Sequence, residues 1–219
     1  MLNREIISGS LPALHPHDSV SRALQLMEEL HVNALPLADQ DEFVGLALED
    51  DLINYDEQDE LSELLPRLTK LSVDADAHIM EAVNFSLKYA LSVIPVTDKE
   101  QHYVGAISAQ ELLWQIGKFI GATEPGAIIV LAMEKNQFSF SELSKIIETN
   151  DAQITQLNTY WEPVAELLHV TVRLNKLEVS DVIATLQRYE YQVKYYFGEE
   201  LYTNELRNNY DHLMNYLKI

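Results

Sequence analysis

One pattern of residues occurs twice in the first half of this 219-residue chain, and it constrains the fold more than any other feature. At a shift of 59 residues, and of 60 after one insertion, the corresponding pairs are Val20 and Ile79, Ala23 and Ala82, Leu24 and Val83, Val32 and Leu91, Pro36 and Pro95, Val44-Gly45 and Val104-Gly105, and Leu52 and Leu112. A unit this short cannot bury both faces of a small sheet alone. The two copies are therefore expected to pack as a pseudo-symmetric pair.

The first copy predicts a helix, a hairpin and a second helix. Asp18-Ser19 is an N-cap signal, and the apolar residues over 20–30 recur at helical spacing. Short strands are predicted over 34–37 and 43–48, separated by turn residues. Acids at the start of 49–54 suit the first turn of another helix, because the helix dipole favours negative charge there.

The second copy repeats this order. A helix is predicted over 79–88, strands over 91–96 and 103–108, and a closing helix over 109–119. The acidic stretch between the copies, over 50–63, is interpreted as a solvated connector, because it lacks the ligand order and the glycine of a calcium loop.

The closing segments of the two copies, Val44–Leu52 and Val104–Leu112, resemble the closing motif of the CBS domain. The resemblance covers roughly residues 1–121, with repeats at about 1–62 and 63–121. It implies an α+β fold in which two CBS repeats form one pair, also called a Bateman module.

The resemblance also implies clefts that hold an adenosine-type ligand. In the family, an aspartate accepts hydrogen bonds from ribose, and a Ser or Thr three residues earlier bonds ribose or phosphate. The first copy has Asp51 but carries Leu48 at the hydroxyl position, whereas the second has Ser108 with the longer Glu111. The remaining contacts that the resemblance implies are Leu35, Pro36, Ile94, Pro95, Gly45 and Gly105.

The ligands implied are AMP, ADP, ATP or S-adenosylmethionine. Glu49 and Asp50 would repel a polyphosphate at the first copy, whereas the second offers Ala109 and Gln110. We therefore expect a ligand of low charge in the second copy. The residues leave open the alternative that Asp51 and Glu111 are ordinary helix-start acids and that no ligand binds.

The second half, after a linker over 121–126, is predicted to have the order β-α-β-β-α-β of ferredoxin-like folds. The predicted elements are strand 127–133, a helix capped by Ser139 or Ser141, strands 152–161 and 167–174, helix 179–189 and strand 191–197. Glu124–Val130 resembles the start of an ACT domain, here placed at 122–200. An apolar stripe predicts a separate C-terminal helix over 201–219.

ACT domains are often amino-acid sensors, with the ligand at the first strand–helix loop. Here that loop, 134–139, has no glycine that would let backbone amides approach a ligand. We therefore expect assembly at least as much as amino-acid binding. The CBS-pair and ACT-like order is similar to that of the acetoin-utilisation regulatory proteins, which implies regulation, no catalysis and a homodimer formed through both domains.

The amino-acid composition excludes some classes of binding partner and of metal site. Thirty-five acids against fifteen bases give a net charge of −20, which argues against nucleic acid and anionic membranes. Without cysteine there is no disulfide and no thiolate metal site. His15 and His17 are interpreted as a solvated pair rather than metal ligands, and His31 and His169 as packed side chains.

Together these features predict a cytoplasmic regulatory protein, because Met1–Glu5 lacks signal-peptide features and the longest apolar run, Ala127–Met133, is too short to span a bilayer. It would bind an adenosine-type ligand and signal by rearranging a dimer to an unidentified partner. The alternative is a non-catalytic scaffold with degenerate clefts.

Overall fold

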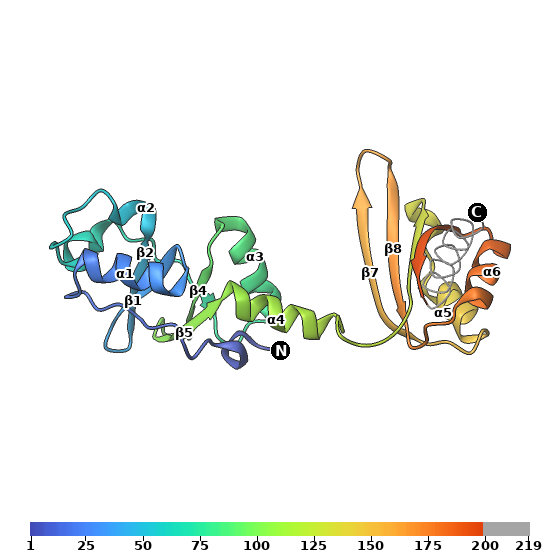
Figure 1. Ribbon diagram of the computed structural model, residues 1–219, viewed down its shortest axis with the longest axis horizontal. Helices are drawn as coiled ribbons and strands as arrows, with labels where there is room; N and C mark the ends of the chain where they lie inside the picture. The colour runs from blue at the N-terminus through green and yellow to red at the C-terminus, as the bar shows by residue number, and fades with distance from the viewer. Residues whose placement is uncertain (199–219) are drawn as a thin grey trace, which may run out of the picture. The chain divides into compact units, whose positions relative to one another are not determined.

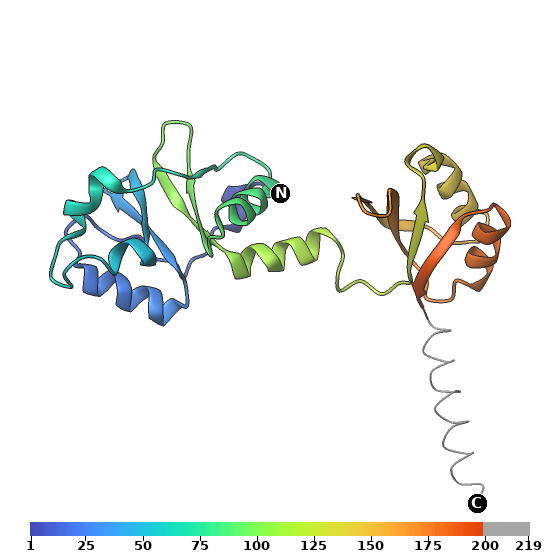
Figure 2. The same ribbon diagram turned by 90° about the horizontal axis from the view of Figure 1, so that it is seen from above.

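The computed structural model divides into two compact units, Met1–Phe119 and Ile120–Ile219 (Figures 1 and 2). The structure describes residues 1–198, so the predicted helix over 201–219 lies outside the described residues. No helix among residues 1–198 is long and apolar enough to cross a bilayer.

The first repeat forms the elements that its pattern predicts. They are α1 (Val20–Leu30), β1 (Ala34–Asp39), β2 (Glu42–Leu48) and α2 (Glu49–Leu52), with β1 and β2 as an antiparallel hairpin. The Ser19 hydroxyl caps α1 by accepting a hydrogen bond from the Arg22 backbone N–H at 3.2 Å. His31 ends α1 with φ 53° and is exposed, so the prediction that it is a packed side chain was wrong.

The second repeat is also built as predicted. It contains α3 (Ile79–Tyr89), β4 (Val93–Thr97), β5 (Tyr103–Ser108) and α4 (Ala109–Phe119). A two-residue strand, β3 (Val73–Asp74), pairs in parallel with β4 and completes a three-stranded sheet in the order β3-β4-β5.

Two 3-10 helices outside the predicted elements pack into the cores of the repeats, and the sequence pattern does not show them. In η1 (Asn3–Ile6), Ile6 is buried in the core of the second repeat. In η2 (Leu61–Arg67), Leu61 and Leu64 are buried in the core of the first repeat. The acidic connector therefore ends in a segment that packs against the first repeat rather than in solvent.

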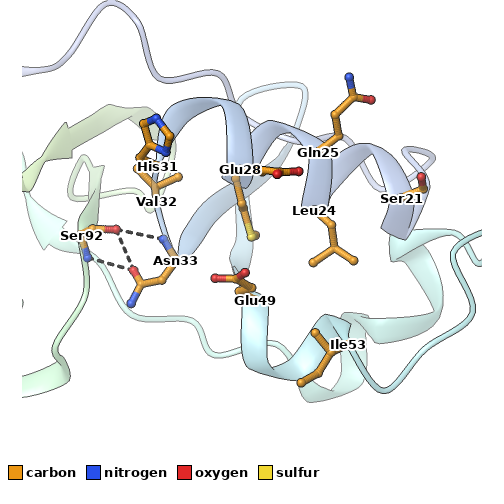
Figure 3. Close-up of a pocket in the computed structure, with 11 residues that line it drawn as sticks. Ser21, Leu24, Gln25, Glu28, His31, Val32, Asn33, Glu49, Ile53 and Ser92 are labelled. Atoms are coloured by element: carbon orange, nitrogen blue, oxygen red, sulfur yellow. Dashed lines mark hydrogen bonds between the residues drawn. The ribbon is translucent and has the colours of Figure 1, made fainter.

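Asn33 and Ser92, which are equivalent positions in the two repeats, bind each other. The Asn33 backbone N–H donates to Ser92 Oγ, and the Ser92 N–H donates to Asn33 Oδ1, both at 3.1 Å. The Ser92 hydroxyl also donates to Asn33 Oδ1 at 2.7 Å, and Figure 3 shows these contacts. At the hairpin ends, Phe43 stacks on its equivalent, Tyr103, with ring centroids 6.2 Å apart. The repeats are thus joined at matching positions.

The second unit has the ferredoxin-like β-α-β-β-α-β order. Its elements are β6 (Ile128–Met133), η3 (Lys135–Gln137), α5 (Phe140–Glu148), β7 (Ile154–Glu162), β8 (Leu167–Leu174), α6 (Ser180–Arg188) and β9 (Gln192–Phe197). The sheet order is β7-β8-β6-β9 with antiparallel neighbours. Of the two predicted caps, Ser139 is the N-cap of α5. This is an ACT-like fold.

Helices α5 and α6 cover one face of this sheet, and alternate residues of β8 pack beneath them. His169 lies between two of these residues, Leu168 and Val170, and its side chain is turned to the other face. There it is fully buried, as predicted, with Nε2 2.6 Å from Glu162 Oε2 and its ring stacked on Tyr160. The cross-strand neighbours on β7 therefore shield it from solvent.

The position of Ile6 predicts that the N-terminal segment stabilises the second repeat. Ile6→Ala removes a side chain that is 3% exposed and leaves a cavity, so we expect a loss of about 2–5 kcal/mol in unfolding free energy. Val164→Ala, at a position 96% exposed, should change it by less than about 0.5 kcal/mol. Urea unfolding followed by circular dichroism measures both. Equal effects would contradict this role for Ile6.

Candidate functional site

The predicted hydroxyl of the second repeat, Ser108, is the last residue of β5 and caps α4. Its Oγ accepts a hydrogen bond from the Glu111 backbone N–H at 3.0 Å and another from the Ser8 hydroxyl at 3.2 Å. A hydroxyl has two acceptor sites and one donor. Both acceptor sites of Ser108 are therefore used, and its own proton is left for an oxygen of a ligand.

Glu111 lies in the first turn of α4, close to Ser108. One carboxylate oxygen, Oε1, accepts a hydrogen bond from the Gln115 side chain at 2.6 Å. Within residues 1–198 no hydrogen bond to its other oxygen, Oε2, is present. The predicted pair thus offers a hydroxyl donor and a carboxylate acceptor at one helix start, which is the combination that a ribose diol requires.

Sequence reasoning missed Ser8. Its Oγ accepts a hydrogen bond from the Ser108 backbone N–H at 3.0 Å, and its own N–H donates to the Ala106 carbonyl at 2.8 Å. The N-terminal segment therefore runs beside β5 and adds a second hydroxyl to the site. The sequence held one sign that this segment belongs to the repeat. An apolar residue followed by a hydroxyl residue precedes both hairpins, as Ile7-Ser8 before β1–β2 and as Leu68-Thr69 before β4–β5.

Gly45 and Gly105 let these segments approach the strands. A Cβ on Gly105 would lie 2.5 Å from Ile7 Cγ2, and φ at Gly105 is 153°. A Cβ on Gly45 would lie 2.8 Å from Leu68 Cβ. The glycines, predicted as ligand contacts, have a packing reason to be glycine at both positions.

The apolar–proline steps, Leu35-Pro36 and Ile94-Pro95, were predicted as ligand contacts, but their side chains are buried. Leu35 and Ile94 are fully buried in the two hydrophobic cores, so only their backbone atoms are left to face a ligand. Pro36 and Pro95 are buried too, and the Pro36 carbonyl already accepts a hydrogen bond from the Leu14 N–H at 2.8 Å. In the first repeat this carbonyl is partly used by the protein itself.

The first repeat offers a poorer site. Asp51 is exposed, and the hydroxyl position before it is Leu48. Helix α2 has only four residues, with Glu49 and Asp50 in its first turn, whereas α4 has eleven. A longer helix has a more developed positive end. The structure therefore favours the second repeat for an anionic group.

The described residues contain one cluster with metal-ligand chemistry, which was not predicted. Asp98, Glu100 and His102 place ligand atoms within 4.8 Å of one another at the turn between β4 and β5. Asp98 accepts hydrogen bonds from the backbone N–H groups of Glu100 and His102, at 3.0 and 2.8 Å. These hydrogen bonds stabilise the β4–β5 turn, and the turn by itself explains why the three side chains lie close together. His15 and His17 are exposed and stacked, with ring centroids 6.1 Å apart.

In the second unit, the first strand–helix loop borders a hollow of about 550 Å³. Its lining includes three carboxylates, Glu134, Glu142 and Glu190. Tyr191 donates a hydrogen bond to Glu142 Oε2 at 3.0 Å, and burial together with this carboxylate raises the pKa of Tyr191 to about 12. Three acids would repel the carboxylate of a free amino acid and attract its ammonium group.

Comparisons with known proteins match the first unit. Inosine-5′-monophosphate dehydrogenase of Methanocaldococcus jannaschii is 27% identical over 112 residues, which is 50% of this chain and 22% of that enzyme. The chain spans less than half the length of the curated relatives that it matches.

Two solved structures are also similar to part of this chain. A CBS domain pair/ACT domain protein from Thermotoga maritima is 20% identical with a TM-score of 0.49, covering 55% of this chain and 99% of that one. A CBS domain pair in complex with 5′-methylthioadenosine and S-adenosyl-L-methionine is 20% identical with a TM-score of 0.44, covering 54% and 98%.

The CBS domain model matches residues 4–58 and 63–118, which are the two repeats and together make up half of the chain. The repeated pattern, the paired cores and this match lead to one conclusion: the chain belongs to the CBS domain family.

Proposed function

We propose that the protein is a regulatory sensor that binds an adenosine nucleoside, or an adenosine nucleotide of low charge, in the cleft of the second repeat. The observation that carries the proposal is the Ser108 site, where Ser8, Ser108 and Glu111 gather at the start of α4. Ribose hydroxyls would donate to Glu111 and accept from Ser108, while backbone groups near Pro95 would read the base. AMP, ADP, ATP and S-adenosylmethionine are the ligands to test.

Charge favours the less anionic of these ligands. Glu111 stands in the first turn of α4, and the chain carries a net charge of −20. Each added phosphate increases the repulsion unless a divalent cation accompanies it. Adenosine, AMP and S-adenosylmethionine should therefore bind more tightly than ATP without Mg²⁺.

Signalling would follow from a dimer with two arrangements. A ligand shifts such an equilibrium only by as much as its affinities for the two arrangements differ. Since the Ser108 site joins the N-terminal segment to α4, a bound ligand would restrain both. We propose a homodimer in the cytoplasm with no catalytic role. The regulated partner would respond to the dimer arrangement, as the resemblance to acetoin-utilisation regulators implies.

A second candidate is a scaffold without a ligand. Two observations favour it: the Ser8 hydroxyl and the Glu111 N–H already use both acceptor sites of Ser108, and the first repeat carries Leu48 where a hydroxyl would be needed. In that case the second unit, the proposed ACT-like domain at 122–200, would act only as an assembly surface.

A thermal-shift panel separates the two candidates. Adenosine, AMP, ADP, ATP and S-adenosylmethionine are added separately, each with and without Mg²⁺. At 100 times Kd a ligand adds about 2.7 kcal/mol of stability, which moves the melting temperature by several degrees. We expect such a shift with at least one of the less charged compounds. No shift with any compound would favour the scaffold.

The site residues give a sharper prediction. Ser108→Ala with Glu111→Ala should abolish the ligand-induced shift, because both ribose contacts are lost. Asp51→Ala should leave most of the shift, since Asp51 belongs to the first repeat and is exposed. If Asp51→Ala alone abolished the shift, the ligand would occupy the first repeat instead.

Ser8 is expected to matter as much as Ser108. Ser8→Ala removes the acceptor of the Ser108 N–H and should weaken binding by about tenfold, a change typical of one lost hydrogen bond near a charged group. Ser10→Ala, at a nearby exposed position, is the matched control and should bind normally. Isothermal titration calorimetry with the ligand found in the panel measures both. Unchanged affinity in Ser8→Ala would remove Ser8 from the site.

A further inference from the structure

The sheet of the second unit has an apolar surface on the face that α5 and α6 do not cover. Successive residues of a strand point to opposite faces of its sheet. Ile129 and Leu131 of β6 pack under the helices, so their neighbours belong to the other face, which we call the open face. Strand register places these residues of β6 and β9 on the open face: Ile128, Val130, Ala132, Tyr195 and Phe197.

Strand β6 is apolar on both of its faces. A strand with one face in water alternates apolar and polar residues, whereas a strand buried on both faces is a continuous apolar run. Ala127–Met133 is such a run. Beside it on the open face, Tyr195 and Phe197 are 46% and 57% exposed, and their rings meet edge to face with centroids 5.7 Å apart. The two strands therefore call for a further layer over the open face.

The apolar part of the open face is confined to one side of the sheet. Strands β7 and β8, on the other side, place Asn158, Thr171 and Arg173 on the same face. These polar side chains suit contact with water, as in an ordinary antiparallel sheet. The surface that needs a cover is therefore a strip over β6 and β9, about as wide as one helix.

The sequence after residue 198 has the pattern of a helix that suits this strip. The apolar stripe of the predicted helix over 201–219 consists of Leu206, Tyr210, Leu213 and Leu217. The opposite side of such a helix carries only polar residues, which are Asn204, Asn208, Asp211, Asn215 and Lys218. Most of the stability of a helix in a protein comes from packing its apolar side, so this stripe requires an apolar surface.

The segment begins where the strip ends. Strand β9 stops at Phe197, which pairs with Ile128 at the first residue of β6. A Cβ on Gly198 would lie 2.5 Å from the Leu177 carbonyl oxygen, so the chain is held close to the sheet as it leaves β9. A helix over 201–219 would be about 28 Å long, and the eight residues of β8 span about 27 Å. The helix and the sheet therefore match in length.

We propose that residues 201–219 form a helix that packs on the open face of their own second unit. Leu206, Tyr210 and Leu213 would contact Tyr195, Phe197 and the outer side of β6. The unit would then consist of three layers, with two helices on one face of the sheet and one helix on the other. This inference goes beyond the proposed function and does not depend on any ligand.

A second copy of the chain lying on the open face is the competing occupant. It would leave the stripe of the segment 201–219 without an apolar partner, and its binding would cost translational and rotational freedom. The chain's own segment is tethered to β9 by residues 198–200 alone. So short a connection gives the segment a high effective concentration at the open face, which favours it over a separate molecule.

A single introduced thiol tests whether the open face is covered, because the chain has no cysteine. Tyr195→Cys places the thiol on the open face, and Val164→Cys, at a position 96% exposed in the β7–β8 turn, is the control. We expect a maleimide to label Tyr195→Cys at least about tenfold more slowly than Val164→Cys, because a covered thiol reacts only after local opening. In urea the two rates should agree. Equal rates in the native protein would overturn the proposal.

Substitutions in the segment test what provides the cover. Leu206→Glu with Leu213→Glu, added to the Tyr195→Cys chain, places charges in the apolar stripe and should raise the labelling rate to that of Val164→Cys. Asn208→Glu with Asn215→Glu adds the same charge on the polar side and should leave labelling slow. Equal labelling rates with the two pairs would overturn the proposal, because protection would then not depend on the stripe.

Cross-linking distinguishes the chain's own segment from that of a second copy. A chain with Tyr195→Cys and Leu213→Cys is treated with a short bis-maleimide and analysed by mass spectrometry. We expect a link within one chain at every protein concentration. Tyr195→Cys with Asp211→Cys, on the polar side of the helix, is the matched control and should link far less. Links only between chains, or no link, would overturn the proposal.

Discussion

The reciprocal contact between Asn33 and Ser92 is the interaction on which the first unit depends. Each residue donates its backbone N–H to the side chain of the other, and each carbonyl accepts the first N–H of a closing helix, Glu49 or Ala109. One pair of equivalent residues therefore fixes both the junction of the repeats and the starts of α2 and α4. The proposed ligand site lies at one of these starts, so its position is a consequence of how the repeats pair.

The repeats share a backbone plan but differ in chemistry. The closing helix of the second repeat is long and capped by Ser108, whereas that of the first has four residues and three acids. The helices diverge as well: α1 and α2 border a hollow lined by Glu28 and Glu49, whereas α3 and α4 expose Leu87, Leu113 and Trp114. A pseudo-symmetric pair of this kind has two unlike clefts and two unlike faces. The proposed single ligand site follows from this asymmetry.

The second unit depends on the packing of its own four-stranded sheet. Its four strands bury one face under α5 and α6, while on the other face the buried His169 is paired with Glu162 and stacked on Tyr160. The hollow beside its first strand–helix loop is lined by three glutamates.

The sequence alone determined the order of the α-helices and the longer strands in both units, because periodic apolar residues and caps such as Ser19 act locally. It did not show the two-residue strand β3 or the 3-10 helices. The resemblance of the closing segments to the CBS motif also singled out Ser108 and Glu111, and the structure places both at the start of α4. The sequence could not show that Ser8 contacts Ser108, which is 100 residues away, or that Ile6 is buried in the second core. It misplaced His31, whose apolar surroundings in sequence do not show that it ends a helix in solvent. Contacts between distant segments depend on how the repeats pair, and only the tertiary structure decided them.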